Sequence, residues 1–118
     1  MSNDAPVIEI TEPAIMVIIN RKYRVGMSEE ELFGVASGNW VVGKRREKAE
    51  YVFAVANGIV KQVYTIERWV PTITNKGQIT NRWIFEGDIA ENLQHYVGGS
   101  IERYVVQGAQ NPVKYINC

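Results

Sequence analysis

The apolar residues near the start of the chain follow patterns of extended structure. Residues 14–20 are rich in β-branched side chains and apolar on both faces, which predicts a central, buried strand. Before it, the alternating residues 7–11 lie between Pro6 and Pro13. Because proline is confined to the edges of sheets and to extended chain, residues 1–13 are expected to form an extended arm or an edge strand.

The dipeptide Asn57-Gly58 separates two apolar segments, residues 49–56 and 59–70. Asn-Gly favours a type I′ turn, because both central residues of that turn take positive φ, and it therefore predicts a β-hairpin. The first segment is apolar on both faces, so it needs cover on both sides, as in a curled sheet backed by a helix. The second segment is long and changes face, which predicts a bulge or a bend within it.

Two segments carry the signals of short helices. Ser28 and Glu31 have the spacing of a capping box, in which each side chain bonds the backbone amide of the other residue. This predicts a helix over residues 28–37 that ends at a left-handed Gly38. Asp88 is expected to cap a second helix, whose apolar positions recur at helical spacing as far as Gly98-Gly99.

The remaining segments are expected to be loops and short strands. Residues 71–81 form a predicted polar loop, residues 82–86 a short strand, and residues 113–117 a final strand, while residues 101–106 fit either a strand or a helix. Consecutive strands in this order are joined by hairpins rather than by crossover helices. The sequence therefore predicts one α+β domain over residues 1–118, a small antiparallel curled β-barrel with two short helices.

The composition is that of a folded protein, which we expect in the cytoplasm. Of its 118 residues, 46% are hydrophobic and 22% are charged, which is ordinary for a globular domain. The longest apolar segment, residues 14–19, is far shorter than the roughly 20 residues that span a bilayer. The polar, acidic residues 1–4 are unlike a secretory signal, and one cysteine, Cys118, excludes an intramolecular disulfide. We expect no membrane partner.

The basic residues gather in two clusters although the charges balance overall. Thirteen bases match thirteen acids, so no net positive field attracts a polyanion. The first cluster contains Arg21, Lys22 and Arg24, and the second contains Lys44, Arg45, Arg46 and Lys48. Local charge steers a polyanion more than net charge does. Each cluster is therefore either a phosphate-binding surface or a solvated loop, and the sequence leaves both interpretations open.

Few residues offer the chemistry of a catalytic site. His95 is the only histidine, and it is expected on the polar side of the second helix, where a surface role is favoured over that of a general base. Glu86 and Asp88 are close together, but carboxylates at the start of a helix usually cap it. No P-loop, nucleophile elbow or dinucleotide-binding glycine motif occurs. We expect no cofactor and no metal, and an enzyme is less favoured than a binding protein.

The tryptophans and the polar residues near the basic clusters indicate a binding site instead. Trp40 follows the first predicted helix and precedes the second basic cluster. An aromatic ring beside arginines can stack an unpaired base while the guanidinium groups hold phosphates, although core packing is the alternative role of each indole. The candidate nucleic-acid-binding residues are Asn20, Arg21, Lys22, Trp40, Lys44, Arg45, Arg46, Trp69, Gln110 and Asn111.

Three segments together resemble a PUA-like domain, the superfamily that includes the ASCH, EVE and YTH domains. They are the Gly38-Asn39-Trp40 turn, the hairpin of residues 51–69 and residues 82–87. Residues 54–60 and 108–115 are also similar to uncharacterised domains found beside GIY-YIG nuclease domains. The resemblance covers most of residues 15–117 and implies a curled barrel that binds RNA or modified DNA, with Trp40 and Trp69 as pocket walls. The ASCH signature is not met, because residues 43–50 place its lysine one position early and lack its arginine.

These features favour a non-catalytic module that binds RNA or single-stranded or modified DNA, with a base in an aromatic pocket and phosphates on the basic loops. The alternative is a protein-interaction or inhibitor subunit that acts on a nuclease or a defence enzyme, which suits the zero net charge of a small chain. A small enzyme or a nucleotide binder with an acidic pocket is a third interpretation.

Overall fold

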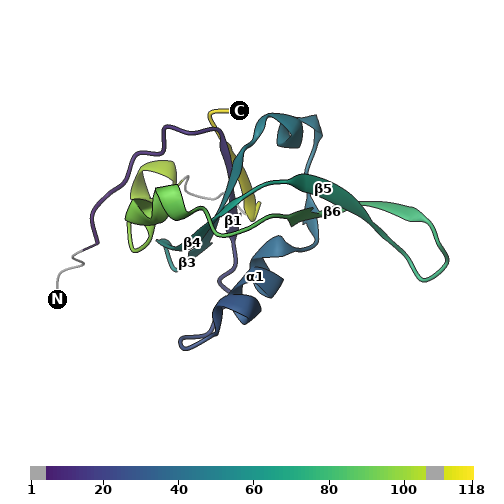
Figure 1. The fold of residues 1–118 in the computed structure, drawn as a ribbon, viewed down its shortest axis with the longest axis horizontal. Coiled ribbons are helices and arrows are strands. Elements are labelled where there is room, and N and C mark those ends of the chain that lie inside the picture. Colours follow the sequence, from purple (N-terminus) through teal and green to yellow (C-terminus); the bar gives the residue numbers. More distant parts are fainter. Residues whose placement is uncertain (1–4, 106–110) are drawn as a thin grey trace.

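The computed structural model describes residues 5–105 and 111–118 (Figure 1). The strands are β1 (Ala14–Ile18), β2 (Trp40–Val41), β3 (Tyr51–Ala56), β4 (Ile59–Thr65), β5 (Arg68–Ile73), β6 (Ile79–Glu86) and β7 (Val113–Ile116). The helices of the described residues are α1 (Glu29–Ser37) and the 3-10 helices η1 (Lys44–Lys48), η2 (Glu91–Tyr96) and η3 (Glu102–Tyr104). The chain therefore combines α and β structure, as the sequence predicts.

The strands form two sheets. Sheet A has the strand order β4-β3-β1-β7, and sheet B has the order β2-β6-β5. Strands β1 and β3 are parallel, with Ala14 opposite Tyr51, whereas the other neighbours are antiparallel. The prediction of a purely antiparallel arrangement is wrong at this pair, because the chain between β1 and β3 returns to the same end of the sheet through α1, β2 and η1. The described strand pairs leave both sheets open.

Sheet A is covered on both faces, which explains why β1 and β3 are apolar throughout. Met16 and Phe53 belong to one buried cluster, which the N-terminal arm and η2 cover. Ile15 and Val52 point the other way and belong to a second cluster, which α1 and sheet B cover. Successive side chains of a strand alternate between its faces, so each strand contributes to both clusters. The predicted burial of residues 14–20 is confirmed for β1.

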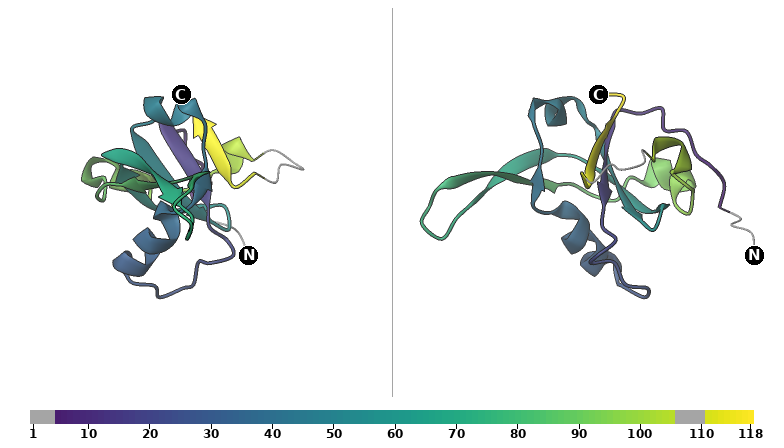
Figure 2. Two further views of the ribbon diagram at one scale, coloured as in Figure 1. Left: turned by 90° about the vertical axis from the view of Figure 1, so that its right-hand side faces the viewer. Right: turned by 180° about the vertical axis from the view of Figure 1, so that it is seen from behind.

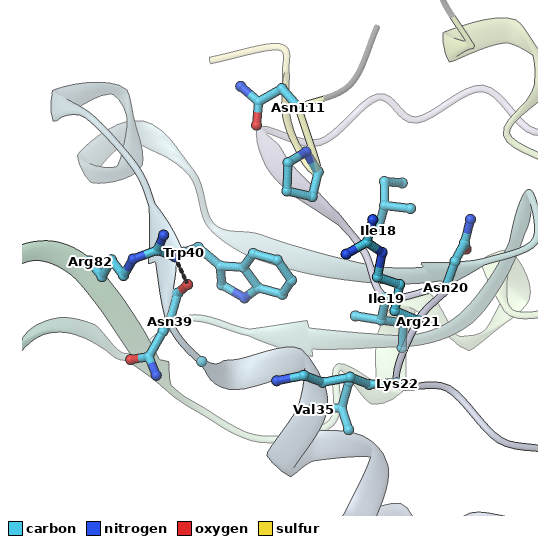
Figure 3. A pocket seen from close by; sticks show the side chains of 12 residues that line it. Ile18, Ile19, Asn20, Arg21, Lys22, Val35, Asn39, Trp40, Arg82 and Asn111 are labelled. Atoms are coloured by element: carbon cyan, nitrogen blue, oxygen red, sulfur yellow. Dashed lines mark hydrogen bonds between the residues drawn. The ribbon is translucent and has the colours of Figure 1, made fainter.

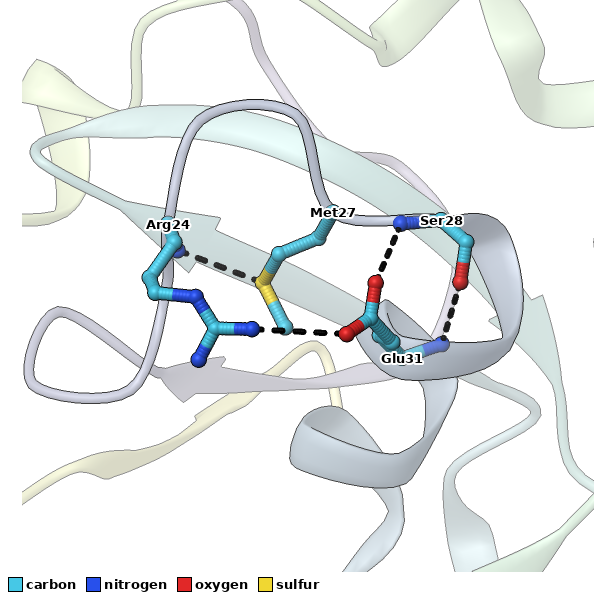
Figure 4. Close-up of polar contacts among 4 residues, drawn as sticks. All are labelled: Arg24, Met27, Ser28 and Glu31. Atoms are coloured by element: carbon cyan, nitrogen blue, oxygen red, sulfur yellow. Dashed lines mark hydrogen bonds and ion pairs between the residues drawn. The ribbon is translucent and has the colours of Figure 1, made fainter.

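Helix α1 begins where the capping box predicts it. Ser28 Oγ accepts a hydrogen bond from the Glu31 amide at 3.1 Å, and Glu31 Oε1 accepts one from the Ser28 amide at 2.9 Å (Figure 4). The bonds to Ser28, and then the nearby Arg24 guanidinium, lower the pKa of Glu31. The stabilisation by the carboxylate is therefore present above the ordinary carboxyl pKa and is lost as the pH falls through the lowered value.

Gly38, which follows α1, does not take the predicted left-handed conformation. Its φ is −131° and its ψ is 166°, which is extended backbone open to any residue. The close packing of β6 accounts for glycine here instead, because a Cβ atom at Gly38 would lie 3.0 Å from Ile84 Cγ2. Glycine at position 38 therefore allows the Ile84 side chain to approach the backbone closely, and it is not needed to relieve backbone strain.

The Asn57-Gly58 hairpin is confirmed. The two residues have φ angles of 54° and 79°, as a type I′ turn requires, and they join the antiparallel strands β3 and β4. Asn20 Oδ1 accepts a hydrogen bond from the Asn57 amide at 2.7 Å, so a residue that follows β1 supports the turn. The predicted irregularity is also present, because the pairing register shifts within the hairpin and the second segment is divided between β4 and β5.

Residues 71–81 form much of a hairpin rather than the predicted polar loop. The end of β5, the turn after it and the start of β6 form the β5–β6 arm (residues 71–82). This arm projects from the body of the molecule (Figures 1 and 2). Pro71 is compatible with β5 because this strand lies at the edge of sheet B. Ile73 and Ile79 pair near the tip and are 63% and 73% exposed. Because solvent surrounds much of the arm, its residues lack the alternation of apolar and polar side chains from which a strand is predicted.

The second predicted helix is shorter and of a different type. Helix η2 is a 3-10 helix that follows Ala90, and its Leu93 has non-helical backbone angles. Asp88 does not cap it; the Asp88 carbonyl instead accepts the Thr65 amide at 2.7 Å, beside the end of β4. Residues 102–104 adopt the helical alternative as η3, and the predicted final strand is confirmed as β7.

The N-terminal arm is extended over its described residues, 5–13, apart from one bridge between Val7 and Ser100. Ile8 and Ile10 are buried in the cluster under it. The hydroxyl of Tyr104 accepts the Ile10 amide at 2.7 Å. These contacts make the arm a cover for one face of sheet A.

Two buried tyrosine hydroxyls differ in their hydrogen bonding, and replacing each of them tests the packing of the core. The Tyr64 hydroxyl has no hydrogen-bond partner among the described residues, and burial, with a smaller effect of the Glu29 carboxylate, raises its pKa. The Tyr96 hydroxyl donates to the Glu12 carboxylate at 2.8 Å. We expect Tyr64→Phe to raise the free energy of unfolding by about 1 kcal/mol, because it removes a desolvated group that has no partner, and Tyr96→Phe to lower it by about 1 kcal/mol. Urea denaturation measures both changes, and a Tyr64→Phe protein less stable than the wild type would contradict this account.

Candidate nucleic-acid interface

A pocket of about 840 Å³ lies where sheet A, sheet B and the end of α1 meet (Figure 3). Its walls come from the residues after β1, from α1 and β2, from β6, and from the residues before β7. The lining residues are Ile18, Ile19, Asn20, Arg21, Lys22, Val35, Gly38, Asn39, Trp40, Arg82, Asn111 and Pro112. The pocket lies within the range of roughly 300–1,000 Å³ that is usual for small-molecule sites.

Strand pairing brings these separate segments together. Strands β1 and β7 are antiparallel neighbours, so the end of β1 meets the start of β7, and the Ile18 amide donates to the Pro112 carbonyl at 2.8 Å. Strand β2 pairs with β6, which places Val41 opposite Arg82. The pocket therefore depends on both sheets and is not the product of one local segment.

Trp40 forms one wall of the pocket and is held in place by α1. Its indole Nε1 donates to the Ala36 carbonyl at 2.8 Å, and part of the ring packs against the second buried cluster. The side chain is half-buried, and Figure 3 shows the ring directed toward the side of the pocket that carries Ile18 and Arg21. Because the polar atom of the indole is already bonded, Trp40 offers a ligand only the apolar and π surface of its ring.

The charged side chains that line the pocket are all basic. They are Arg21, Lys22 and Arg82, and no Asp or Glu is among the described residues that line it. Arg82 Nη1 donates to the Asn39 carbonyl at 3.3 Å, while Arg21 and Lys22 have no side-chain hydrogen bond or ion pair within the described ranges. The arrangement combines a positive rim with an aromatic wall, and it suits an anion that carries a planar ring.

The structure brings together five of the ten candidate residues predicted from the sequence. Asn20, Arg21, Lys22, Trp40 and Asn111 all line the pocket. The carboxamides of Asn20 and Asn111 also have local roles, since Asn20 Oδ1 accepts the Asn57 amide and Asn111 Oδ1 accepts the Val113 amide. Arg21 and Lys22 of the first basic cluster therefore share one site with Trp40, whereas Arg24 forms an ion pair with Glu31.

The second basic cluster lies elsewhere, on η1. Lys44 is exposed there, away from the residues that line the pocket. The Arg45 guanidinium lies 4.4 Å from the centroid of the Tyr115 ring and donates to the Cys118 carbonyl. The Arg46 guanidinium lies 3.7 Å from the centroid of the Trp83 ring and donates to the Gly43 carbonyl at 2.9 Å. Both arginines thus make intramolecular contacts that hold η1 against the sheets.

The last two candidates are also separate from the pocket. Trp69 packs in the second buried cluster, with its ring centroid 5.6 Å from that of Phe85. It borders a smaller hollow of about 280 Å³ together with Arg46, where Glu47 and Glu67 supply negative charge. Gln110 lies outside the described residues, so only its neighbour Asn111 can be placed.

Arg82 is the charged residue of the pocket that the sequence interpretation missed. A usable signal was present, because a strand that directs Trp83 and Phe85 to one face directs Arg82 to the other. The pairing of β6 with β2, which places Arg82 beside the pocket, could not be predicted from local pattern, because β2 contains only two residues, Trp40 and Val41. The third cation of the site thus depends on a long-range strand pairing.

Comparisons with protein-family models, with curated proteins and with solved structures found no match. Within residues 5–105 and 111–118, no group of three or more His, Cys, Asp or Glu side chains is placed to hold a metal ion. No helix in the same ranges has the length and apolar character needed to cross a bilayer.

Proposed function

We propose that this chain binds an unpaired nucleotide of RNA or of single-stranded or modified DNA in the pocket beside Trp40. The base stacks on the indole beside Arg21, and the phosphates contact Lys22 and Arg82. The observation that supports this most strongly is that an available aromatic ring and three basic side chains converge on one pocket, with no carboxylate among the described residues that line it. The pocket is therefore unlike the acidic site of the enzyme or nucleotide-binder interpretation.

The energetics of the two kinds of contact are compatible with such a ligand. Stacking of a base on an aromatic side chain contributes about 1–3 kcal/mol, and it tolerates any base because every base has a π face. The basic side chains supply attraction that does not depend on sequence. Since Arg21 and Lys22 are exposed and have no partner within the described ranges, a phosphate does not have to displace an existing ion pair from them.

The resemblance to PUA-like domains is part of this proposal. In that interpretation the two sheets are the halves of a curled barrel that share the second buried cluster, to which Val52 of sheet A and Phe85 of sheet B both contribute. The base pocket then lies between the halves, and Trp40 is its wall. Trp69, the other wall implied by the resemblance, packs beside Phe85 instead.

The β5–β6 arm favours a second candidate function, that of a protein-interaction or inhibitor subunit for a nuclease or a defence enzyme. Ile73 and Ile79 expose apolar surface at the end of a projecting hairpin, where it contributes nothing to the core. Recovery of one defined protein partner after nuclease treatment, and its loss in an Ile73→Ser, Ile79→Ser protein, would favour this function.

Binding of single-stranded oligonucleotides at two salt concentrations tests the first proposal. Neutralisation of two phosphates predicts that log K falls with log salt with a slope of about −1.4, at about 0.7 for each contact. A stacked base should also quench Trp40 emission, so the quench should persist in Trp69→Phe and be largely lost in Trp40→Phe. Absence of binding at low salt, or binding with the same quench in Trp40→Phe, would contradict the proposal.

A further inference from the structure

The polar side chains around the pocket differ in which of their hydrogen-bonding groups remain available. Each backbone N–H that bonds Asn20 or Asn111 requires an acceptor, so the carboxamide oxygen of each residue must be the atom it meets. Each carboxamide is thereby left with its NH₂ group. Figure 3 shows the carboxamide of Asn39, the third asparagine, directed away from the indole.

The basic residues add donors only, because guanidinium and ammonium groups have no acceptor atom. Arg21 and Lys22 keep all of their side-chain N–H groups, since none is bonded within the described residues. Arg82 uses only Nη1, toward the Asn39 carbonyl. Several of the nearby backbone acceptors are already occupied, among them the carbonyls of Ile19 and Pro112. Donors therefore outnumber acceptors among the available side-chain groups of the pocket.

A donor-rich site discriminates between bases as well as attracting phosphate. The Hoogsteen edge of guanine or hypoxanthine presents two adjacent acceptors, N7 and O6, which match the two parallel N–H groups of an arginine fork. Adenine presents N7 beside an N6 amino donor, and a donor on the base facing a donor on the protein leaves both without a partner. A purine also offers Trp40 a larger surface for stacking than a pyrimidine does.

We infer that the pocket selects a 6-oxopurine, that is guanine or hypoxanthine, over adenine, with Arg21 as the residue that reads the N7–O6 edge. The inference rests on the proposed function and adds to it the class of base. Among the unpartnered cations of the pocket, Arg21 is the only one with a fork, since Lys22 carries a single ammonium group suited to a phosphate. Figure 3 shows the Arg21 guanidinium on the side of the pocket toward which the indole ring is directed.

The test uses short single strands in which one base is flanked by abasic nucleotides, so that only that base can stack on Trp40. Strands with hypoxanthine and adenine carry the same phosphates and differ only at the six-position and the adjacent ring nitrogen. We expect hypoxanthine and guanine to bind on the order of tenfold more tightly than adenine, the discrimination typical of a good bidentate contact. Replacement of guanine by 7-deazaguanine should remove most of that advantage.

Two variants separate recognition of the base edge from the attraction of phosphates by positive charge. Arg21→Lys keeps the positive charge and therefore the salt dependence, but it should reduce the preference for hypoxanthine to about twofold or less because the fork is lost. Asn20→Asp keeps the oxygen that supports the Asn57 amide and replaces the NH₂ donor with an acceptor, so it should shift the preference toward adenine. The general loss of affinity from the new charge cancels in the ratio of the two strands.

The outcomes of this test distinguish the selection of a 6-oxopurine from the proposed function on which it rests. If no strand binds at low salt, the proposed function itself fails. If all strands, including those with uracil or cytosine, bind equally with quenching of Trp40, the function stands and the selection of a 6-oxopurine is overturned. A preference for hypoxanthine that is unchanged in Arg21→Lys would remove Arg21 as the reading residue.

Discussion

Replacement of Gly87 by alanine is expected to lower the free energy of unfolding by about 3 kcal/mol or more, because the methyl group collides with backbone rather than with a movable side chain. A Cβ atom at Gly87 would lie 1.8 Å from the carbonyl oxygen of Thr65 and 2.8 Å from its carbonyl carbon. The segment that follows β6 would have to move away from the end of β4.

That movement would break a set of hydrogen bonds between the two segments. The Thr65 amide donates to the Asp88 carbonyl and the Glu67 amide donates to the Glu86 carbonyl, each at 2.7 Å, and the Ala90 amide donates to the Val63 carbonyl at 2.9 Å. A domain of this length has a total stability of roughly 6–18 kcal/mol, so the expected loss is a large part of it. Urea denaturation should show a lower midpoint for Gly87→Ala.

Gly34→Ala is the matched control for this substitution. It adds the same methyl group inside α1, where the added carbon meets no atom within 4 Å apart from its chain neighbours and the backbone of the helix itself. Because alanine has a higher helix propensity than glycine, we expect this protein to be more stable than the wild type by roughly 0.5–1 kcal/mol. A Gly87→Ala protein as stable as Gly34→Ala would show that the end of β6 does not pack against β4 as described.

Simultaneous replacement of Arg21 and Lys22 by alanine is expected to weaken the binding of single-stranded nucleic acid by at least about tenfold at low salt. Both side chains line the pocket, and both are exposed. Loss of the phosphate contact of Lys22 should also reduce the slope of log K against log salt by about 0.7. Titration of a labelled strand at several salt concentrations measures the affinity and the slope together.

The Lys44→Ala, Lys48→Ala protein provides a control with the same change in net charge. Both lysines belong to η1, are exposed and lie outside the residues that line the pocket. If the pocket is the binding site, this control should bind nearly as the wild type does, whereas attraction by the general charge of the protein would weaken both variants equally. Equal weakening would therefore assign the binding to diffuse electrostatics, with no role for the pocket.

The features predicted best from the sequence are those encoded within a few residues. The capping box of Ser28 and Glu31 identified α1, and Asn57-Gly58 identified the β3–β4 hairpin, because in both cases neighbouring residues provide the required bonds or φ angles. The parallel pairing of β1 with β3 was not predicted, since it depends on a partner supplied by a distant part of the chain. The β5–β6 arm was missed because its exposure removes the alternation of apolar and polar side chains.

The candidate site was predicted in part for the same reason. Asn20, Arg21 and Lys22 are adjacent in sequence, and their convergence with Trp40 required only that the end of β1 lie near the end of α1. Arg45 and Arg46 form an equally basic stretch, yet each arginine contacts an aromatic ring of a distant strand. A sequence pattern gives the density of charge, but it does not show which charges find a partner when the chain folds.

The position of β1 between β3 and β7 has a consequence for biosynthesis. Ala14 pairs with Tyr51 on one side and with Ile116 on the other, so β1 is enclosed by a strand that is synthesised much later than β1 itself. A growing chain can form the β3–β4 hairpin and add β1 to it, but the outer backbone groups of β1 stay open until residues 113–116 have been made. During translation that open edge is exposed to chaperones and to pairing with other nascent strands.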